Sequence, residues 1–435
     1  MSKLTPRSVD CHSSGMWLTS AILLDNGGDR YRVVDIEVSD GHVSALLSPG
    51  ARRADAVDAS ALVVLPGLCN AHYHGCSSLF TGLTSGMEID DWGDASPRGR
   101  AQARLFRWLD EEATRADLVA LYRKEFLDLL GQGVTFIADS GVSERAEGVA
   151  AEVMSEIGMV GSIECYGALA TSGGRGDVGV SLHFPEEEDL DEDSVAATSD
   201  AWAAGSVPLT GHCLETALRR EKVGRRFGTS TVGVLDAADL LGPSTVLFHG
   251  CLMDDTDIEL VAARGASVVN CPMSNVMTSG RVAPLRRWLE AGVNVGLGTD
   301  WADTDMWGCL RAAWAILTAQ GDRRPRSAAD VLTMATEGGR SCYRPAVGGI
   351  TVGAPADLVF VDAGALRPYL QSSEVSTMAA ALVSRGGASL VRHVMVAGQW
   401  VRFNGSATRL SWPDVQLRYE QLTDELFTRL QRDAE

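Results

Sequence analysis

The middle of the chain alternates short apolar segments, each long enough for a β-strand, with longer amphipathic segments such as 115–130 and 257–264. This alternation is typical of parallel sheets, because a parallel strand pair needs a helical crossover between its members. Eight apolar segments follow one another, so we expect an α/β fold in which the sheet closes into a (β/α)8 barrel. The expected barrel strands are Val63–Leu68, Val134–Ala138, Met159–Cys165, Gly179–His183, Val207–His212, Thr245–His249, Ala266–Asn270 and Val293–Gly298.

Both ends of the chain have a different texture from the middle. Residues 16–65 read as short strands bounded by turn signals, and the tail returns to the same pattern in Ala356–Val361 and His393–Val401. We therefore predict a small composite β-sandwich domain, a barrel domain between its two parts, and a terminal helix that starts near Ser411. The expected boundaries are 1–65 with 346–410 for the small domain, 66–345 for the barrel and 411–435 for the helix.

Charge and cysteine content narrow the class of partner and the compartment. The formal net charge is −19, which disfavours binding to nucleic acid or to an anionic membrane surface. Nine cysteines at irregular spacing, with no signal peptide and no apolar run of membrane-spanning length, indicate a soluble protein with reduced thiols in the cytoplasm. The acidic run Glu186–Asp193 is interpreted as a solvated loop or a helix start.

The motif with the most chemical content is Ala71-His72-Tyr73-His74, which follows an apolar segment. Side chains at i and i+2 of a strand face the same way, so His72 and His74 can share one metal ion. Three further chemistry-bearing residues stand at the ends of later expected strands: His212, His249 and Asp300. Because the carboxyl ends of barrel strands converge on one face, we expect all five side chains to meet there.

With these motifs on the page, the chain resembles the amidohydrolase superfamily, in its branch of cytosine, guanine and adenosine-type deaminases and triazine hydrolases. The resemblance covers nearly the whole chain. Besides the strand with the two histidines it includes Asn270-Cys271-Pro272-Met273-Ser274-Asn275, Gly296-Leu297-Gly298-Thr299-Asp300 and Gly353-Ala354-Pro355-Ala356-Asp357-Leu358.

The resemblance implies that His72, His74, His212 and Asp300 bind one divalent metal and leave a position open for water. Neutral imidazoles with one carboxylate suit zinc, and ferrous iron is the alternative. Such a metal lowers the pKa of water and makes hydroxide available near neutral pH. Binuclear relatives use a carboxylated lysine, but the expected second to sixth strands contain no lysine, so we expect one metal ion.

Three residues are expected to do the proton chemistry. Glu215 stands three residues after His212, where relatives carry a glutamate that moves protons. A carboxyl group with a raised pKa can protonate a ring nitrogen and then the departing amine. By the same resemblance, His249 hydrogen-bonds the water and the developing oxygen, and Asp300 can accept a proton from the water.

Substrate contacts are expected from His183 at the end of the fourth strand, from Trp92 in a loop over residues 75–98 that roofs the pocket, and from Trp301. Asn275 is expected just behind the reacting groups. Trp301 departs from the small residues that relatives place there, and Gly75 and Gly250 replace larger or thiol-bearing ones. These departures leave the metal chemistry intact but remove any inherited substrate identity.

The sequence thus predicts a hydrolase of carbon–nitrogen bonds that releases ammonia from a small amino-substituted heterocycle such as a purine, pyrimidine or pterin. One alternative keeps the metal and changes the bond, through ring opening of a cyclic amide or displacement of a halide. Another, from a different class, is an inactive scaffold or binding protein. By analogy with the family we also expect a homo-oligomer.

Overall fold

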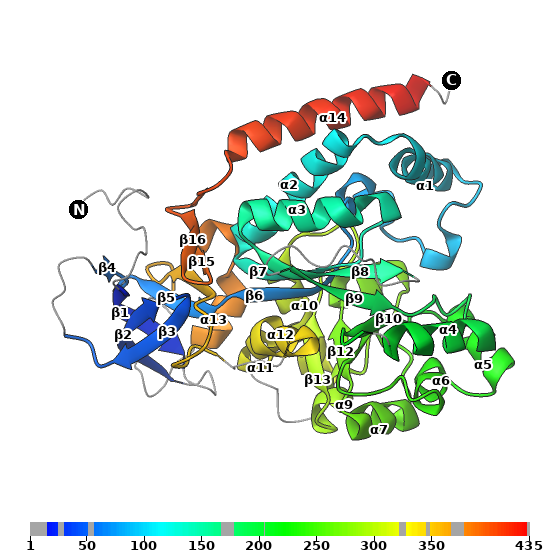
Figure 1. Cartoon of the computed structure of the whole chain (residues 1–435), viewed down its shortest axis with the longest axis horizontal. Coiled ribbons are helices and arrows are strands. Elements are labelled where there is room, and N and C mark those ends of the chain that lie inside the picture. The colour runs from blue at the N-terminus through cyan, green and yellow to red at the C-terminus, as the bar shows by residue number, and fades with distance from the viewer. Residues whose placement is uncertain are drawn as a thin grey trace.

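Two β-sheets built from different parts of the chain organise the fold (Figure 1). We describe them from a computed structural model that covers residues 15–24, 30–50, 56–166, 178–203, 205–321, 328–344, 349–366 and 378–432.

The larger body is an eight-stranded parallel sheet in which spatial order follows sequence order. Its two edge strands meet through a bridge between Tyr73 and Asp300, and the Asp300 N–H donates to the His72 carbonyl at 3.0 Å. The sheet therefore closes, and the predicted (β/α)8 barrel is confirmed. Its strands are β6 (Leu68–Tyr73), β7 (Val134–Asp139), β8 (Val160–Tyr166), β9 (Val178–His183), β10 (Leu209–Cys213), β11 (Thr245–His249), β12 (Ser267–Asn270) and β13 (Asn294–Leu297).

Helices pack around this barrel. The α2 helix illustrates how they are delimited: Thr114 and Asp117 form a capping box at its start, and Gly133, at φ 94°, ends it. The longer helices are α1 (Pro97–Arg107), α2 (Arg115–Gln132), α3 (Glu147–Ile157), α4 (Glu192–Ala203), α5 (Ala217–Phe227), α6 (Thr231–Ala237), α7 (Asp255–Arg264), α8 (Pro272–Thr278), α9 (Leu285–Glu290), α10 (Met306–Ala319), α11 (Ala328–Thr333), α12 (Gly339–Tyr343), α13 (Met378–Arg385) and α14 (Trp412–Arg432). Short 3-10 or π turns are η2 (Ser77–Phe80), η3 (Ile89–Asp91), η4 (Trp108–Glu112), η5 (Glu144–Ala146), η6 (Met334–Gly338) and η8 (Ala388–Leu390).

The first expected barrel strand was placed wrongly. Most of Val63–Leu68 belongs to β5 (Leu62–Pro66) of the other sheet, where Val63 and Val64 pair with β1. The barrel strand begins only at Leu68, after Gly67. A Cβ atom on Gly67 would lie 2.0 Å from the Thr135 hydroxyl oxygen, so only glycine fits at this crossing. Both segments are apolar, and periodicity cannot separate two buried strands in series.

The second sheet joins both ends of the chain, as expected from their shared texture. It has nine strands and encloses a hydrophobic core of its own, which includes Leu18, Ile36, Leu358 and Phe360. Helix α13 lies within the segment expected to belong to the small domain, but it packs against the barrel helices α10 and α11. The domain boundaries given above stay a prediction. The strands are β1 (Met16–Leu24), β2 (Tyr31–Ser39), β3 (His42–Leu47), β4 (Val57–Asp58), β5, β14 (Leu358–Asp362), β15 (Val391–Val396), β16 (Gln399–Phe403) and β17 (Ser406–Ala407).

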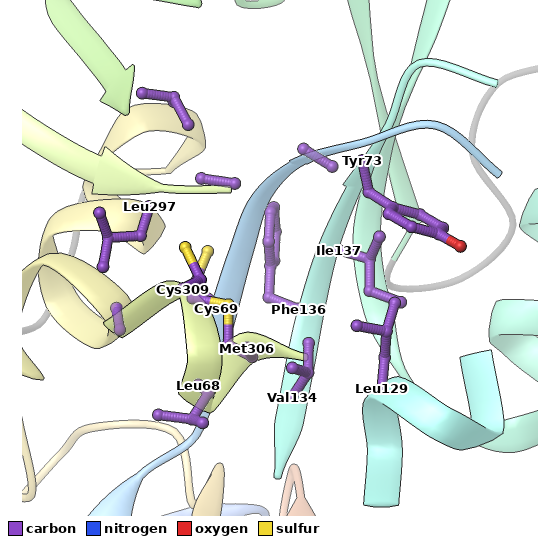
Figure 2. Close-up of a cluster of buried hydrophobic side chains, with 14 of the residues drawn as sticks. Leu68, Cys69, Tyr73, Leu129, Val134, Phe136, Ile137, Leu297, Met306 and Cys309 are labelled. Atoms are coloured by element: carbon purple, nitrogen blue, oxygen red, sulfur yellow. The ribbon is translucent and has the colours of Figure 1, made fainter. Parts of the chain in front are cut away.

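The main core lies between the barrel wall and its helices. Figure 2 shows Leu129 of α2 and Ile137 of β7 pointing toward each other. Met306 and Cys309 of α10 and Cys69 of β6 belong to the same buried cluster. Burying such side chains stabilises the fold by about 1.5–3 kcal/mol each. This packing gives the strand ends a rigid support.

The terminal helix α14 lies along α2, as Figure 1 shows, and Arg418 of α14 forms an ion pair of 3.2 Å with Asp117. Within the described ranges, none of the helices is both long enough and apolar enough to cross a lipid bilayer.

Candidate metal centre and active site

Four histidines and one aspartate gather at the carboxyl ends of the barrel strands. His72 lies in β6 and His74 just beyond it, while His212 and His249 lie in β10 and β11 and Asp300 follows β13. All except His74 are less than a tenth exposed, and His74 is only partly exposed. The convergence expected from strand topology is therefore present, although the role of each residue stays a prediction.

The polar atoms of this cluster lie within a few ångströms of one another. The Nε2 atoms of His72 and His74 are 3.1 Å and 3.3 Å from Asp300 Oδ1. The ring of His212 lies 5.2 Å from that of His72 and 5.5 Å from that of His74, centre to centre. Phe248 stacks on His72 with ring centres 3.8 Å apart and covers its inner face.

The outer nitrogen of three of the four rings faces an oxygen that can only accept. His74 Nδ1 is 2.7 Å from the Gly141 carbonyl oxygen, His212 Nδ1 is 2.8 Å from Glu186 Oε1, and His249 Nδ1 is 2.8 Å from Asn275 Oδ1. A carbonyl or carboxylate oxygen can only accept, so the Nδ1 atom of each of these three rings carries a proton, and Nε2 presents a lone pair when the ring is neutral. This is the tautomer that a histidine needs in order to bind a metal.

The arrangement fits a divalent metal ion. His72 Nε2 is buried and makes no well-formed hydrogen bond to any described residue, which leaves a strong donor atom unsatisfied. Ligand atoms of His72, His212 and His249 all lie within 4.8 Å of one another, as do those of His72, Cys271 and Asp300. Imidazole nitrogens with one carboxylate are the donor set that zinc or ferrous iron prefers.

For His72 and Asp300, electrostatics favour the protonation states that metal binding requires. Burial holds the pKa of His72 well below its ordinary value, so the ring is neutral. Burial alone would raise the pKa of Asp300, but the close approach of His72 and His74 outweighs it and holds that pKa well below its usual range. A neutral imidazole beside an ionised carboxylate is the ligand state that a divalent cation selects.

The backbone is strained where it presents these groups. Leu214, His249 and Asp300 have φ values of 51°, 66° and 62°, in the left-handed region that non-glycine residues rarely occupy. Such residues cost about 1–3 kcal/mol each and cluster at functional sites. The strained Leu214 directly precedes Glu215 and turns the chain out of β10.

Glu215 is 2% exposed and lines the central cavity. Arg219, one helical turn later, donates to Glu215 Oε2 at 3.1 Å. The preceding Leu214 N–H donates to the carboxylate of the buried Glu187 at 2.8 Å. These contacts hold the proton-shuttle candidate in place beside the histidine cluster.

A cavity of about 590 Å³ opens in front of this cluster. Its wall includes His74, His212, Glu215, His249 and Asp300, and also the expected Trp92 and Trp301. The indole of Trp301 lies 4.9 Å from that of Trp92 and 5.4 Å from the His74 ring. The loop over 75–98 therefore contributes to the cavity, through Ile89 and Trp92.

His183 is not among the residues that line this cavity. It is 3% exposed, and its ring stacks on Tyr166 with centres 4.4 Å apart. Tyr166, in contrast, lines the cavity. A direct substrate contact by His183 stays a prediction, and its position behind Tyr166 does not support it.

The interpretation of the acidic run as solvated was wrong for its first two residues. Glu186 lines the cavity and accepts from His212, and Glu187 is 1% exposed. They follow β9 directly, so they lie at the carboxyl face of the barrel. A run of charged residues in the sequence does not indicate whether a given residue lies at the carboxyl face of the barrel. The number of residues between it and the end of a strand does. Asp189, Glu192 and Asp193, later in the run, are exposed as expected.

Glu186 gives a first testable prediction. Burial opposes protonation of His212, but the adjacent Glu186 carboxylate outweighs it and raises the pKa of His212 to about 9. Removing this partner should leave the ring poorly oriented and less basic. We expect Glu186→Gln to weaken zinc affinity about 10- to 100-fold, measured by competition with a chelating dye. Glu188→Gln, which alters a neighbour that contacts Arg219 but not His212, should keep the parent affinity. Equal affinities for both variants would contradict this role.

Comparison with known proteins shows which protein family and which solved structures this chain is similar to. The sequence profile of the Amidohydrolase family matches residues 63–401. A 5-methylthioadenosine/S-adenosylhomocysteine deaminase from Natronomonas pharaonis is 28% identical, over 92% of this chain and 96% of that protein. Among solved structures, an adenosine deaminase from Xanthomonas campestris with bound zinc has a TM-score of 0.82 at 20% identity, over 95% of this chain and 98% of the other. A triazine hydrolase from Arthobacter aurescens has a TM-score of 0.80 at 19% identity, covering 94% and 99%.

Proposed function

We propose that this chain, which belongs to the amidohydrolase family, is a metal-dependent hydrolytic deaminase that releases ammonia from a purine-type heterocycle. The observation that carries the proposal is the placement of Glu215 on the wall of the same cavity as His74, His212, His249 and Asp300. The deaminase from Natronomonas pharaonis, aligned over nearly the whole of both chains, supports this reaction class and a purine nucleoside as the substrate class.

In this proposal His72, His74, His212 and Asp300 hold one divalent metal, with zinc preferred over iron. When bound, such a metal polarises a water molecule and lowers its pKa toward neutral values. His249 is set to accept a hydrogen bond, because its Nδ1 proton is engaged by Asn275 and its Nε2 lone pair is left free. Asp300, which is ionised, could take up the proton that such a water loses.

Glu215 performs the two proton deliveries that deamination requires. It first protonates a ring nitrogen, which makes the neighbouring carbon accept the water oxygen. Left as a carboxylate, it takes up the proton that the added oxygen still carries and passes it to the amine as the carbon–nitrogen bond breaks, so that ammonia leaves. The proton held by Asp300 then restores the acid form of Glu215. Arg219 fixes one carboxylate oxygen, Oε2, and so orients the other toward the reacting group.

The aromatic side of the cavity suits a flat substrate. Trp92, Trp301 and Phe106 line it, and the rings of Trp92 and Phe106 lie 4.9 Å and 5.8 Å from Trp301. Indole and phenyl rings pack on planar heterocycles and exclude water from them. A purine held against this wall would present its amino-bearing edge to the metal cluster.

Ammonia release tests the proposal. We would load the protein with zinc and incubate it with 5′-methylthioadenosine, S-adenosylhomocysteine, adenosine, cytosine and an aminopterin, and measure ammonia by a coupled assay. Release from at least one purine nucleoside is expected. Cyclic amides and halogenated triazines belong in the same panel, since the triazine hydrolase shares the fold. Ring opening or halide release, with ammonia from none of the amines, would overturn deamination.

A cytoplasmic location and a homo-oligomeric state form part of the same proposal. The eight cysteines within the described residues are all buried free thiols, as expected for a reducing compartment. Light scattering after size-exclusion chromatography would measure the oligomeric state.

A further inference from the structure

One carboxylate on the cavity wall accepts no hydrogen bond from the described part of the chain. Glu164 lies in β8 and is 2% exposed, and neither of its carboxylate oxygens makes a hydrogen bond. The nearest cationic candidate, His183 Nε2, is 4.0 Å from Glu164 Oε2, which is too far for a hydrogen bond. A buried carboxylate without a donor is costly, so a protein retains one where something else supplies the donor.

Glu164 faces the cavity that holds the proposed reaction site, beside groups that cannot satisfy it. Arg219 is the single lysine or arginine among the described lining residues. Its guanidinium is already engaged by Glu215 at 3.1 Å and by Glu188 at 3.0 Å, with Glu186 at 3.6 Å. Among the lining residues that the structure describes, no further guanidinium or ammonium group is therefore available to Glu164.

The character of the whole wall points the same way. Five carboxylates line the cavity besides that of Asp300, against the single Arg219 among the described lining residues, which is already paired: Asp110, Asp139, Glu164, Glu186 and Glu215. Aromatic rings of Trp92, Phe106, Tyr122, Tyr166 and Trp301 form much of the remainder. Carboxylates attract cations and repel anions, and aromatic faces bind cations as well. An anionic substituent would find no free positive charge on this described wall.

From these observations, and resting on the proposed deaminase function, we propose that Glu164 is a specificity-determining residue. It receives a second nitrogen group of the substrate, an amine, amidine or guanidine, distinct from the amino group that leaves as ammonia. The substrate class is thus a purine-type heterocycle with a cationic or N–H-rich substituent, and not one with a carboxylate or phosphate.

Matched substrates test this assignment. The panel contains adenosine derivatives with an amine, a hydroxyl or a carboxylate at the 5′ or the 3′ position. We expect kcat/KM to be at least about tenfold higher for an amine at one of these positions than for the hydroxyl, with the carboxylate lowest. Glu164→Gln keeps the side-chain shape and removes the charge. It should lower kcat/KM for the preferred amine about 10- to 100-fold and change that for adenosine less than about threefold.

Two controls separate recognition from other causes. Glu152→Gln removes the same charge on the outer helix α3, where Glu152 pairs with Arg115, and should leave the substrate preference unchanged. Thermal unfolding gives a second readout. Because Glu164 accepts no hydrogen bond from a described residue and His183, its ion-pair contact, is 4.0 Å away, Glu164→Gln should unfold at the same or a higher temperature than the parent. Loss of a well-formed structural ion pair would lower that temperature.

Measuring the binding of the deaminated product tests the role of Glu164 without requiring that the protein release ammonia. Calorimetry would compare inosine with its amine-bearing counterpart in parent and Glu164→Gln proteins. An amine preference that Glu164→Gln abolishes supports the inference even if no substrate releases ammonia, in which case only the proposed function fails. Equal loss for all derivatives, preference for the carboxylate, or a second equivalent of metal that depends on Glu164 would each overturn it.

Discussion

Chelation of the metal is expected to abolish ammonia release, and added zinc should restore it. Dialysis against a strong chelator should lower the rate to less than about 1% of the starting value, because water without a metal has a pKa of about 15.7 and is a poor nucleophile at neutral pH. The measurement is ammonia release together with metal content by elemental analysis. Activity that follows the metal content through removal and reconstitution would establish the dependence.

The same dependence should be traceable to the individual side chains. His74→Ala removes one imidazole whose Nε2 lies 3.3 Å from Asp300, and we expect the variant to purify with little zinc and no activity. His42→Ala is the matched control, since His42 is exposed on the other sheet and contacts the Asp40 carbonyl oxygen. It should retain both metal and activity. Full activity of a metal-free preparation, or a zinc-loaded and active His74→Ala, would refute the assignment.

Metal removal should also lower the temperature of thermal unfolding. A ligand that binds only the folded state stabilises it, by about 4 kcal/mol when present at a thousandfold excess over its Kd. Without the cation, several imidazoles and a carboxylate remain buried together with unsatisfied lone pairs, of which His72 Nε2 is the clearest. If the chain were an inactive scaffold that binds no metal, treatment with a chelator should leave the unfolding temperature unchanged.

Much of the frame around this centre followed from the sequence, for a physical reason. Strand and helix periodicities are local, and the parallel closure they predict brings strand ends together whatever the loops do. His212, at the end of β10, and His249, at the end of β11, could therefore be assigned to one face before any coordinates. The boundary between β5 and β6 could not be predicted, because both strands are buried and apolar and only Gly67 separates them.

The groups that refine the site were harder to foresee. Glu164 sits inside a strand where it looks like an isolated charge, and Glu186 begins an acidic run that resembles a solvated loop. Their importance depends on which way β8 faces and how the segment after β9 turns, and both are tertiary properties. His183 stands at a strand end, but its ring stacks on Tyr166 of the neighbouring strand and does not line the cavity, so a direct substrate contact stays a prediction. The position of a residue relative to a strand end predicts that it lies at the carboxyl face of the barrel. It does not predict whether its side chain reaches the cavity.

Replacement of Glu215 by glutamine is expected to reduce kcat about 10²- to 10⁴-fold, the usual contribution of a positioned acid or base. The amide can occupy the same space and still receive the Arg219 contact seen at 3.1 Å, but it cannot release a proton. KM and zinc content should change little, because Glu215 is neither a proposed metal ligand nor part of the aromatic wall that is proposed to bind most of the substrate. Glu221→Gln, in the helix α5 that follows Glu215 and paired with Arg225 at the surface, is the control and should keep the parent kcat.

The leaving group makes this experiment sharper. Deamination asks Glu215 to protonate both a ring nitrogen and the departing amine, whereas 6-chloropurine riboside loses chloride, which needs no proton. The Glu215→Gln penalty should therefore be smaller for the chloro compound than for adenosine, and the difference measures the second proton delivery. An equal penalty for both would restrict Glu215 to ring protonation. No penalty for either would show that the proton comes from elsewhere, and Asp300, buried against His72 and His74, would become the residue to test.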